Sequence, residues 1–520
     1  MVIQWLIKPK MYQDSVKLMK LSAEIAGQDG IRQASVIMAT DMNKNTLKEA
    51  DMLVPEIAAA GANDLVIVIG ADTEEQAKGA IALAENMLTS TGGKKSKSQE
   101  VLPRTLESAC QALPGSNLAL ISLPGCYAAA EAMKAINLGL NVHLFSDNVS
   151  LEDEIRLKQR AAQKGLLVMG PDCGTAIING VPLAFANVVA RGKIGIIGAS
   201  GTGIQEATVL IERLGGGISH AIGTGGRDLS DAVGGIMMLQ GIDILEKDPA
   251  TKVIMLVSKP AGPQTTTRIL ARVKQCKKPV VVCLIKGELT AINESGAVGA
   301  ATLEDAVYKA ISLANEEVAV PIPDNYWGDF SKEIQRLASS LKPGQRYLRG
   351  LFTGGTLADE AMIVLREILG DVYSNIPLRP EYRLPSARKS QANTVVDLGD
   401  DEFTQGRPHP MIDPLPRNER ILQEFADPEV ALILCDVVTG YGSHRDPAGE
   451  LAQAVSKARQ AYPENNPVII AFVCGTEADP QPLSQQVEIL KEAAIIVMPS
   501  NAAAAKTAGK LIELHAKQGV

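Results

Sequence analysis

Aromatic residues are scarce in this 520-residue chain: Phe, Trp and Tyr make up 3% of it, although hydrophobic residues make up 46%. The interior must therefore be built mainly from Ala, Val, Ile, Leu and Gly, a mixture that suits parallel sheets covered by helices. Because one hydrophobic core rarely organises a chain of this length, we expect three domains of ordinary size.

Other absences narrow the function. Seven cysteines occur at irregular spacing without a C-x-x-C pair, which argues against a disulfide framework and a zinc site and favours a reducing, cytoplasmic setting. We expect no bound metal. The net charge of −8 and the lack of a Lys/Arg block argue against nucleic-acid and membrane partners. No apolar run approaches the roughly 18 residues of a membrane span, and the start lacks the order of a signal peptide.

What the chain does contain is a repeated order of strand, turn and helix. Short apolar runs are each followed by a Gly, Pro, Ser or Asp turn; examples are 65–69, 118–122, 142–145, 166–169 and 253–257. This order predicts an α/β fold with parallel sheets and right-handed crossovers. Ligands in such folds bind at the carboxyl ends of the strands.

Prolines interrupt that order between residues 318 and 344. Pro321 and Pro323 precede a short helical segment, and Pro343 and Gly344 follow it, which is typical of an interdomain connector. We therefore predict three domains and one linker. The domains are 1–190, 191–320 and 345–520, and the linker is 321–344.

A Gly-rich turn follows the apolar run 194–199. Its residues are Ser200, Gly201, Thr202 and Gly203, and a helical pattern begins there. Missing side chains let backbone N–H groups converge, and the positive end of a helix favours negative charge. The turn predicts a phosphate cradle, although it lacks the Lys-Ser/Thr ending of a P-loop and the spacing G-x-G-x-x-G. A tight structural turn is the alternative.

A second turn of this kind follows the apolar run 430–438, with a helical pattern from about residue 448. Its candidate phosphate-binding residues are Gly440, Tyr441, Gly442 and Ser443. Two helix N-termini that face one phosphate would clamp it, so we predict that the two turns act together. Arg445, just after the second turn, either closes over the phosphate or pairs with Asp446.

Several segments resemble the succinyl-CoA synthetase family. Three have the order and spacing of its alpha subunit: 168–175, 192–202 and 223–228. Three resemble the carboxyl-terminal ligase domain of its beta subunit: 351–357, 396–400 and 438–442. Nearly the whole chain is similar to the FdrA family of acyl-CoA synthetases, through 145–155, 165–175 and 406–414. The resemblance implies a Rossmann-like CoA-binding-type domain followed by two flavodoxin-like ligase domains.

Three departures from the synthetase pattern bear on the chemistry. Where that family carries a phosphorylated histidine in a Gly-His-Ala-Gly segment, residues 293–300 contain no histidine. Where a glutamate partners that histidine, Lys259 stands, so the charge is reversed. The nucleotide-binding ATP-grasp domain of the beta subunit has no counterpart. We therefore expect phosphate to be a substrate in its own right, and CoA use stays open.

The FdrA resemblance implies a subunit of oxamate carbamoyltransferase, which converts oxalurate and phosphate into oxamate and carbamoyl phosphate in allantoin breakdown. It also implies two further protein subunits, and a homo-oligomer is compatible with it. Two alternatives remain. One is an acyl-CoA synthetase whose ATP-grasp partner is a separate chain, and the other is a non-catalytic scaffold or regulatory subunit that binds an acyl phosphate or CoA.

The remaining site candidates fall into three sets. Candidate catalytic residues are Lys259, Arg407 and His409. A cation beside phosphate favours an anionic ligand, Arg suits a planar carboxylate, and His can act as acid, base or oxyanion donor. A surface lysine and a rigid proline-rich loop are the structural alternatives. Gly225 and Gly226 are added to the phosphate site because they let a loop approach closely. Candidate substrate-binding residues are Thr353, Gly354, Gly355 and Arg445.

Overall fold

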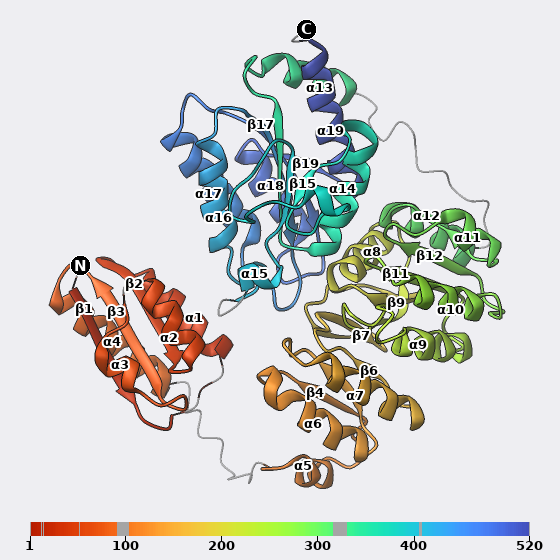
Figure 1. Cartoon of the computed structure of the whole chain (residues 1–520), viewed down its shortest axis with the longest axis horizontal. Coiled ribbons are helices and arrows are strands. Elements are labelled where there is room, and N and C mark those ends of the chain that lie inside the picture. Colours follow the sequence, from red (N-terminus) through yellow and green to blue (C-terminus); the bar gives the residue numbers. More distant parts are fainter. Residues whose placement is uncertain are drawn as a thin grey trace. The chain divides into compact units, whose positions relative to one another are not determined.

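The computed structural model describes residues 2–11, 13, 15–50, 52–90, 103–315, 330–404 and 408–518. The chain divides into two compact units, one of residues 1–102 with 404–408 and the other of residues 103–403 with 409–520. The structure is mixed α/β with mainly parallel sheets (Figure 1), which confirms the predicted fold class.

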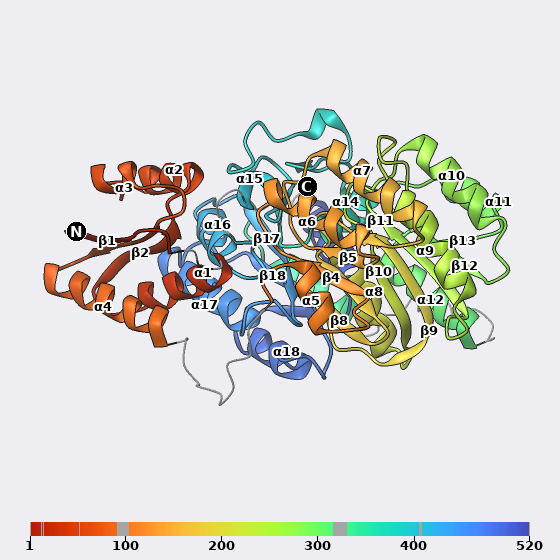
Figure 2. The same cartoon turned by 90° about the horizontal axis from the view of Figure 1, so that it is seen from below.

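The first unit contains a three-stranded sheet. Strand β3 (Leu65–Ala71) lies between β1 (Val2–Lys8) and β2 (Ile31–Met38) and runs antiparallel to both. Every residue of β3 is buried, because helices cover both faces of the sheet. Helices α1 and α4 lie on one face and α2 and α3 on the other (Figure 2). These helices are α1 (Ser15–Ala26), α2 (Asp41–Glu49), α3 (Pro55–Ala59) and α4 (Glu74–Ser90).

The prediction of parallel pairing is wrong for this sheet. Strands β1 and β2 point the same way but do not pair with each other, since β3 fills the place between them in the opposite direction. An apolar run that is buried on both faces has the same pattern in a parallel and in a central antiparallel strand. The structure also differs from the single domain expected over 1–190, because the first 102 residues form a unit of their own.

The second unit begins with a small parallel sheet. Its strands are β4 (Leu118–Ile121), β5 (Asn141–Leu144) and β6 (Val168–Met169). Its helices are α5 (Leu106–Ala112), α6 (Gly125–Asn137) and α7 (Leu151–Gln163). Helix α7 also packs against α9 (Ile236–Lys247) of the following sheet, so this part and the next share one hydrophobic core.

A seven-stranded sheet follows, in the order β13-β12-β11-β9-β10-β7-β8. Its strands are β7 (Thr175–Ile178), β8 (Val181–Ala184), β9 (Arg191–Ala199), β10 (Ile218–Gly223), β11 (Val253–Ser258), β12 (Val280–Leu284) and β13 (Val298–Gly299). Helices α8 and α12 pack on one face, and α9 and α10 on the other (Figure 1). The helices are α8 (Gly201–Arg213), α9 (Ile236–Lys247), α10 (Pro263–Val273), α11 (Leu289–Glu294) and α12 (Leu303–Asn315). Hairpin β7–β8 belongs to this sheet although it precedes residue 191.

The last sheet is fully parallel and has the order β15-β16-β14-β17-β18-β19. Its strands are β14 (Tyr347–Phe352), β15 (Tyr373–Ser374), β16 (Thr394–Asp397), β17 (Val430–Val438), β18 (Val468–Cys474) and β19 (Ile496–Met498). Helices α13, α14 and α19 lie on one face and α16, α17 and α18 on the other (Figure 1). The helices are α13 (Phe330–Ser340), α14 (Gly355–Leu369), α15 (Asp401–Thr404), α16 (Leu415–Phe425), α17 (Pro447–Ala461), α18 (Leu483–Glu492) and α19 (Asn501–Gln518).

The two larger sheets reverse their strand order at equivalent places. In one, β9 lies between β10 and β11, and α8 follows it directly; in the other, β14 lies between β16 and β17, and α14 follows it directly. Ligands of open α/β sheets bind at the carboxyl end of the strand where the order reverses. The topology therefore points to the first turns of α8 and α14.

Within the ranges given above, no helix combines the length and the apolar character that crossing a membrane requires.

Candidate functional site

The first turns of α8 and α14 meet at a pair of hydroxyl groups. Ser200 caps α8, because its Oγ accepts a hydrogen bond from the Gly203 N–H at 2.9 Å. The same Oγ lies 2.5 Å from Thr356 Oγ1 in the first turn of α14. Gly354 fits here because a Cβ on it would lie 2.9 Å from Thr202 Cβ. Two helix N-termini from different domains thus face each other.

Four backbone donors where the two helices meet have no acceptor among the described residues. The first N–H groups of a helix lack partners within the helix. Just before α14, the buried Asp436 carboxylate accepts hydrogen bonds from the N–H groups of Thr353 and Gly354. Among the described residues, no acceptor faces the N–H groups of Gly201, Thr202, Gly355 and Thr356. Together with the two helix dipoles, these donors suit an anion. We call residues 200–203 and 353–356 the junction.

A lysine and an aspartate meet across Gly355. A Cβ on Gly355 would lie 2.4 Å from Asp397 Oδ2 and 2.7 Å from Lys259 Nζ. Lys259 follows β11 and Asp397 ends β16, so the carboxyl ends of strands from both sheets supply them. Only glycine at position 355 leaves room for both groups.

Burial and opposite charge shift the pKa values of Asp397 and Lys259. Burial raises the pKa of Asp397, which is 3% exposed, to about 7, against the opposing effect of the Lys259 ammonium. Burial acts to lower the pKa of Lys259, but the carboxylates of Asp397 and Asp359 outweigh it and hold that pKa above its ordinary value. Lys259 is therefore a fixed cation at neutral pH.

His409 lies on the other side of Asp397. Its Nδ1 accepts the Met411 N–H at 3.2 Å, so in the neutral ring the proton is assigned to Nε2. A Cβ on Gly399 would lie 2.8 Å from that Nε2 and 3.2 Å from Asp397 Oδ1. Burial, with a further contribution from Lys259, lowers the pKa of His409 to about 4. The ring is thus a neutral hydrogen-bond donor at physiological pH.

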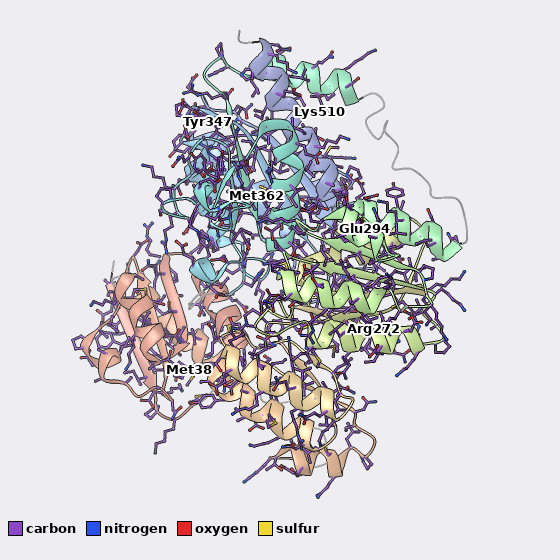
Figure 3. The ribbon with its side chains drawn as sticks, turned by 45° about the vertical axis from the view of Figure 1, so that its right-hand side comes forward. Met38, Arg272, Glu294, Tyr347, Met362 and Lys510 are labelled. Atoms are coloured by element: carbon purple, nitrogen blue, oxygen red, sulfur yellow. The ribbon has the colours of Figure 1, made fainter. Side chains whose placement is uncertain are left out.

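The remaining residues that the sequence predicted for the site lie in different parts of the chain. Gly225 contacts the loop at 170–171, since a Cβ on it would lie 2.3 Å from the Pro171 carbonyl oxygen, and a Cβ on Gly226 would lie 3.8 Å from Asp172 Oδ2. Arg407 falls outside the described residues. The segment 293–300 ends α11 and continues into β13; Glu294 on α11 is exposed (Figure 3).

Two of the backbone donors in the second Gly-rich turn are already hydrogen-bonded. Gly440 N–H donates to Gln481 Oε1 at 3.0 Å and Tyr441 N–H to the Ala186 carbonyl at 2.9 Å. A Cβ on Gly442 would lie 2.7 Å from the Phe185 ring, and the Ser443 hydroxyl donates to the Thr439 carbonyl.

Helix α17 begins only at Pro447, after this turn. Its N-cap is Asp446, whose carboxylate accepts the Gly449 N–H at 3.0 Å, so a carboxylate occupies the place that an anion would take. Arg445 is exposed and has no ionic partner in the described parts of the chain. The structure thus joins Ser200 directly to the turn at 353–356 and packs the turn at 440–443 on 185–186.

Sequence reasoning missed a second contact between α8 and α14. Buried Asn501 at the start of α19 donates its N–H to Glu206 Oε1 on α8 at 3.2 Å and its Nδ2–H to Glu360 Oε2 on α14 at 2.7 Å. Burial raises the pKa of Glu206 to about 7 and that of Glu360 to about 8. The sequence did contain a signal for this contact, because Glu206 and Glu360 are polar residues on the packed faces of amphipathic helices.

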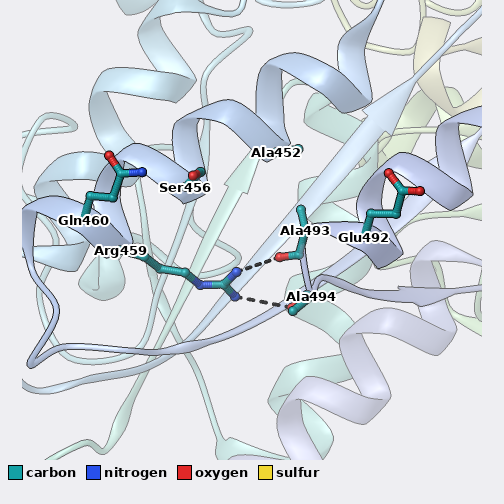
Figure 4. Close-up of a pocket in the computed structure, with 7 residues that line it drawn as sticks. All are labelled: Ala452, Ser456, Arg459, Gln460, Glu492, Ala493 and Ala494. Carbon is teal, nitrogen blue, oxygen red and sulfur yellow. Dashed lines mark hydrogen bonds between the residues drawn. The ribbon is translucent and has the colours of Figure 1, made fainter.

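A separate cavity of about 360 Å³ lies between α17 and α18 (Figure 4). Its charged residues are Arg459 and Glu492. Arg459 donates hydrogen bonds to the carbonyl oxygens of Ala493 and Ala494, at 2.6 and 3.3 Å. These are carbonyls at the C-terminus of α18, where a cation is expected for structural reasons. The cavity contains no residue of the junction.

Family models match three parts of the chain. The model described as AllF, heavy metal-associated domain, matches residues 1–103; that of the CoA binding domain matches 190–282; and that of CoA-ligase matches 351–511. The CoA binding match falls after the region 1–190, where CoA binding is expected from the sequence. Residues 1–103 contain neither cysteine nor histidine, so thiolate and imidazole ligands are missing from this part.

The chain is also similar to individual proteins. The uncharacterized protein YahF of Escherichia coli K12 is 46% identical over 511 residues, which cover 96% of this chain and 97% of that protein. The malate–CoA ligase subunit alpha of Methylorubrum extorquens is 28% identical, covering 50% of this chain and 92% of that subunit. A solved dinucleotide-forming acetyl-coenzyme A synthetase of Ca. Korarchaeum cryptofilum is 18% identical, covers 86% of this chain and 95% of its own, and has a TM-score of 0.34. The chain belongs to the FdrA-type family of succinyl-CoA synthetase-like proteins.

Proposed function

We propose that the chain catalyses phosphate-dependent acyl transfer, and more specifically that it is a subunit of oxamate carbamoyltransferase, acting with two further subunits. Similarity to CoA ligase subunits supports the broader class, in which an activated acyl group passes through a phosphate site. The carbamoyl transfer from oxalurate to phosphate is our own, finer proposal.

The junction is the observation that carries this proposal. Four unpaired N–H groups, two helix N-termini and the Lys259 ammonium supply positive potential for a phosphate dianion. The segment that aligns with the phosphohistidine loop contains no histidine. Phosphate bound at the junction would therefore act on the carbamoyl group without a covalent phosphoenzyme.

The proposed reaction balances without a nucleotide. An oxygen of hydrogen phosphate attacks the carbamoyl carbon of oxalurate, the C–N bond to the oxamate part breaks, and the proton of hydrogen phosphate ends on the leaving nitrogen. The products are carbamoyl phosphate and oxamate. His409 Nε2–H and the junction N–H groups are the donors for the oxyanion that develops on the carbamoyl oxygen, and Lys259 offsets the phosphate charge.

The test is phosphorolysis of oxalurate by the chain alone and with its partner subunits, without ATP or CoA, with carbamoyl phosphate followed by 31P NMR. Ser200→Ala should raise the KM for phosphate or lower kcat, by about 10- to 100-fold in all. Ser150→Ala is the matched control, because Ser150 caps α7 in the same way and is exposed; it should leave the reaction unchanged.

An acyl-CoA synthetase with a separate ATP-grasp partner is the second candidate. The matches to CoA binding and CoA-ligase models favour it. Acyl-CoA formation that needs ATP and CoA, with no phosphorolysis of oxalurate, would establish it in place of the transferase. Tight binding of carbamoyl phosphate without turnover in every reconstituted complex would instead indicate a regulatory subunit.

A further inference from the structure

At Gly355 in the junction, a cation and a carboxylate oxygen flank the position that a side chain would occupy. Lys259 Nζ and Asp397 Oδ2 both lie within van der Waals reach of the position that a Cβ would occupy, at 2.7 and 2.4 Å. No ion pair within 4.0 Å joins them in the described structure. A cation and a carboxylate oxygen are therefore held close together at the N-terminus of α14.

Asp397 is held so that one oxygen remains available. Its Oδ1 accepts the Gly399 N–H at 2.9 Å, and its backbone N–H and C=O are both hydrogen-bonded to the Asn375 side chain. In the described residues, Oδ2 has no donor. Because Oδ2 has no donor among the described residues, it can accept a hydrogen bond from a ligand that carries an N–H group.

This pair of groups complements a carbamoyl group. A carbamoyl carbon carries a C=O acceptor and an NH2 donor side by side. The Lys259 ammonium, besides offsetting the phosphate charge, would join His409 Nε2–H as a donor to the C=O, and Asp397 Oδ2 would accept from the NH2. An acetyl group of the same shape has a methyl in place of NH2, so it would bury Oδ2 without a partner. Sites built around a substrate N–H discriminate strongly against analogues that lack it.

We propose that Asp397 is a specificity-determining residue, which makes the site select carbamoyl over acyl groups by accepting a hydrogen bond from the carbamoyl NH2. The inference rests on the proposed function, because it assumes that the junction binds the phosphate of the same ligand. Under this proposal, a residue of the third domain determines which group is transferred.

Carbamoyl phosphate and acetyl phosphate are matched probes, because they differ only by NH2 in place of CH3. Titration calorimetry on the full chain should show that carbamoyl phosphate binds about tenfold more tightly or better. Asp397→Ala should remove this preference and leave acetyl phosphate affinity within about twofold.

Asp397→Asn keeps the size of the side chain and serves where the alanine variant fails to fold. Because the Gly399 N–H requires an oxygen at Oδ1, the amide nitrogen faces the ligand, and the preference for carbamoyl phosphate should again be lost. Equal binding of both probes to the unmodified chain would overturn the role of Asp397 and leave the phosphate site standing. Binding of neither probe would overturn the proposed function and this inference together.

Discussion

Two Gly-rich turns in this chain have similar sequences and opposite chemistry. At 353–356, helix α14 begins at the second glycine, and its first turn lies against Ser200 and Lys259. At 440–443, the N–H groups of Gly440 and Tyr441 are bonded to Gln481 and Ala186, and α17 begins four residues later behind an aspartate cap.

The difference teaches that glycine spacing alone does not make an anion cradle. What matters is whether the helix begins within the turn, whether a side chain already occupies its N-terminus, and whether another helix end faces it. By these criteria the first turn of α14 is the partner of Ser200. The turn at 440–443 packs one domain on the other through Ala186 and Phe185, and its role in binding phosphate stays a prediction.

The largest effect is expected from filling the space at Gly355. Gly355→Val would push a side chain onto Asp397 and Lys259, and activity should fall by about 100-fold or more because the reacting groups are displaced. Gly344→Ala is the control, since no atom lies within 4 Å of a Cβ at that position. Steady-state phosphorolysis measures both; an active Gly355→Val variant would place the chemistry elsewhere.

A substitution at Glu206 tests whether a proton on its buried carboxyl group stabilises the packing of α8 and α14. Burial raises the pKa of Glu206 from 4.5 to about 7, so the folded state binds the proton more tightly and stability falls as pH rises from about 4.5 to about 7. Glu206→Gln keeps the acceptor for Asn501 and cannot ionise. By thermal denaturation it should match the unmodified chain near pH 4 and exceed it by up to about 3 kcal/mol at pH 8.

A gain that does not change with pH would contradict this role for Glu206.

Thr356→Val tests the contact between the hydroxyl groups of Ser200 and Thr356. Valine keeps the shape of threonine but removes the Oγ1 that contacts Ser200, so the phosphate affinity of the junction should fall by about tenfold. Thr507→Val is the matched buried control, because the Thr507 hydroxyl bonds only to the Ala503 carbonyl within α19. Calorimetric titration with inorganic phosphate distinguishes them, and equal affinities would count against the junction.

The smallest effect is expected at the second turn. Asp446→Ala removes the N-cap of α17 and should cost about 1 kcal/mol of stability, while the KM for phosphate stays unchanged. Urea denaturation and phosphorolysis kinetics check the two halves of this expectation. A raised phosphate KM would return the turn at 440–443 to the binding site.

Local patterns predicted much of the fold. The runs at 118–122 and 253–257 are strands, the helix after Ser200 begins at Gly201, and the helix expected near residue 448 begins at Pro447. These features follow from apolar runs, glycines and capping residues that lie close together in the sequence. The direction of strand pairing in the first unit depends on distant segments, so it was not predictable in this way.

The same limit applies to the site. Ser200 and Lys259 were identifiable because each follows a predicted strand, and Thr353 to Gly355 because they match a family segment. That Thr356 faces Ser200 depends on how two domains pack. Asp436 carried a clearer signal, since a carboxylate inside the apolar run 430–438 is costly unless it has donors.

The hydrogen bonds between Asn187 and Asp479 and between Asn187 and Thr439 join the two ligase-type regions of one polypeptide. In an enzyme that divides such regions between subunits, each active site depends on the concentration of both chains. Here the encounter is intramolecular, so its effective concentration is set by the connection and not by expression level. The junction should therefore survive dilution, and its two halves are always made in a one-to-one ratio.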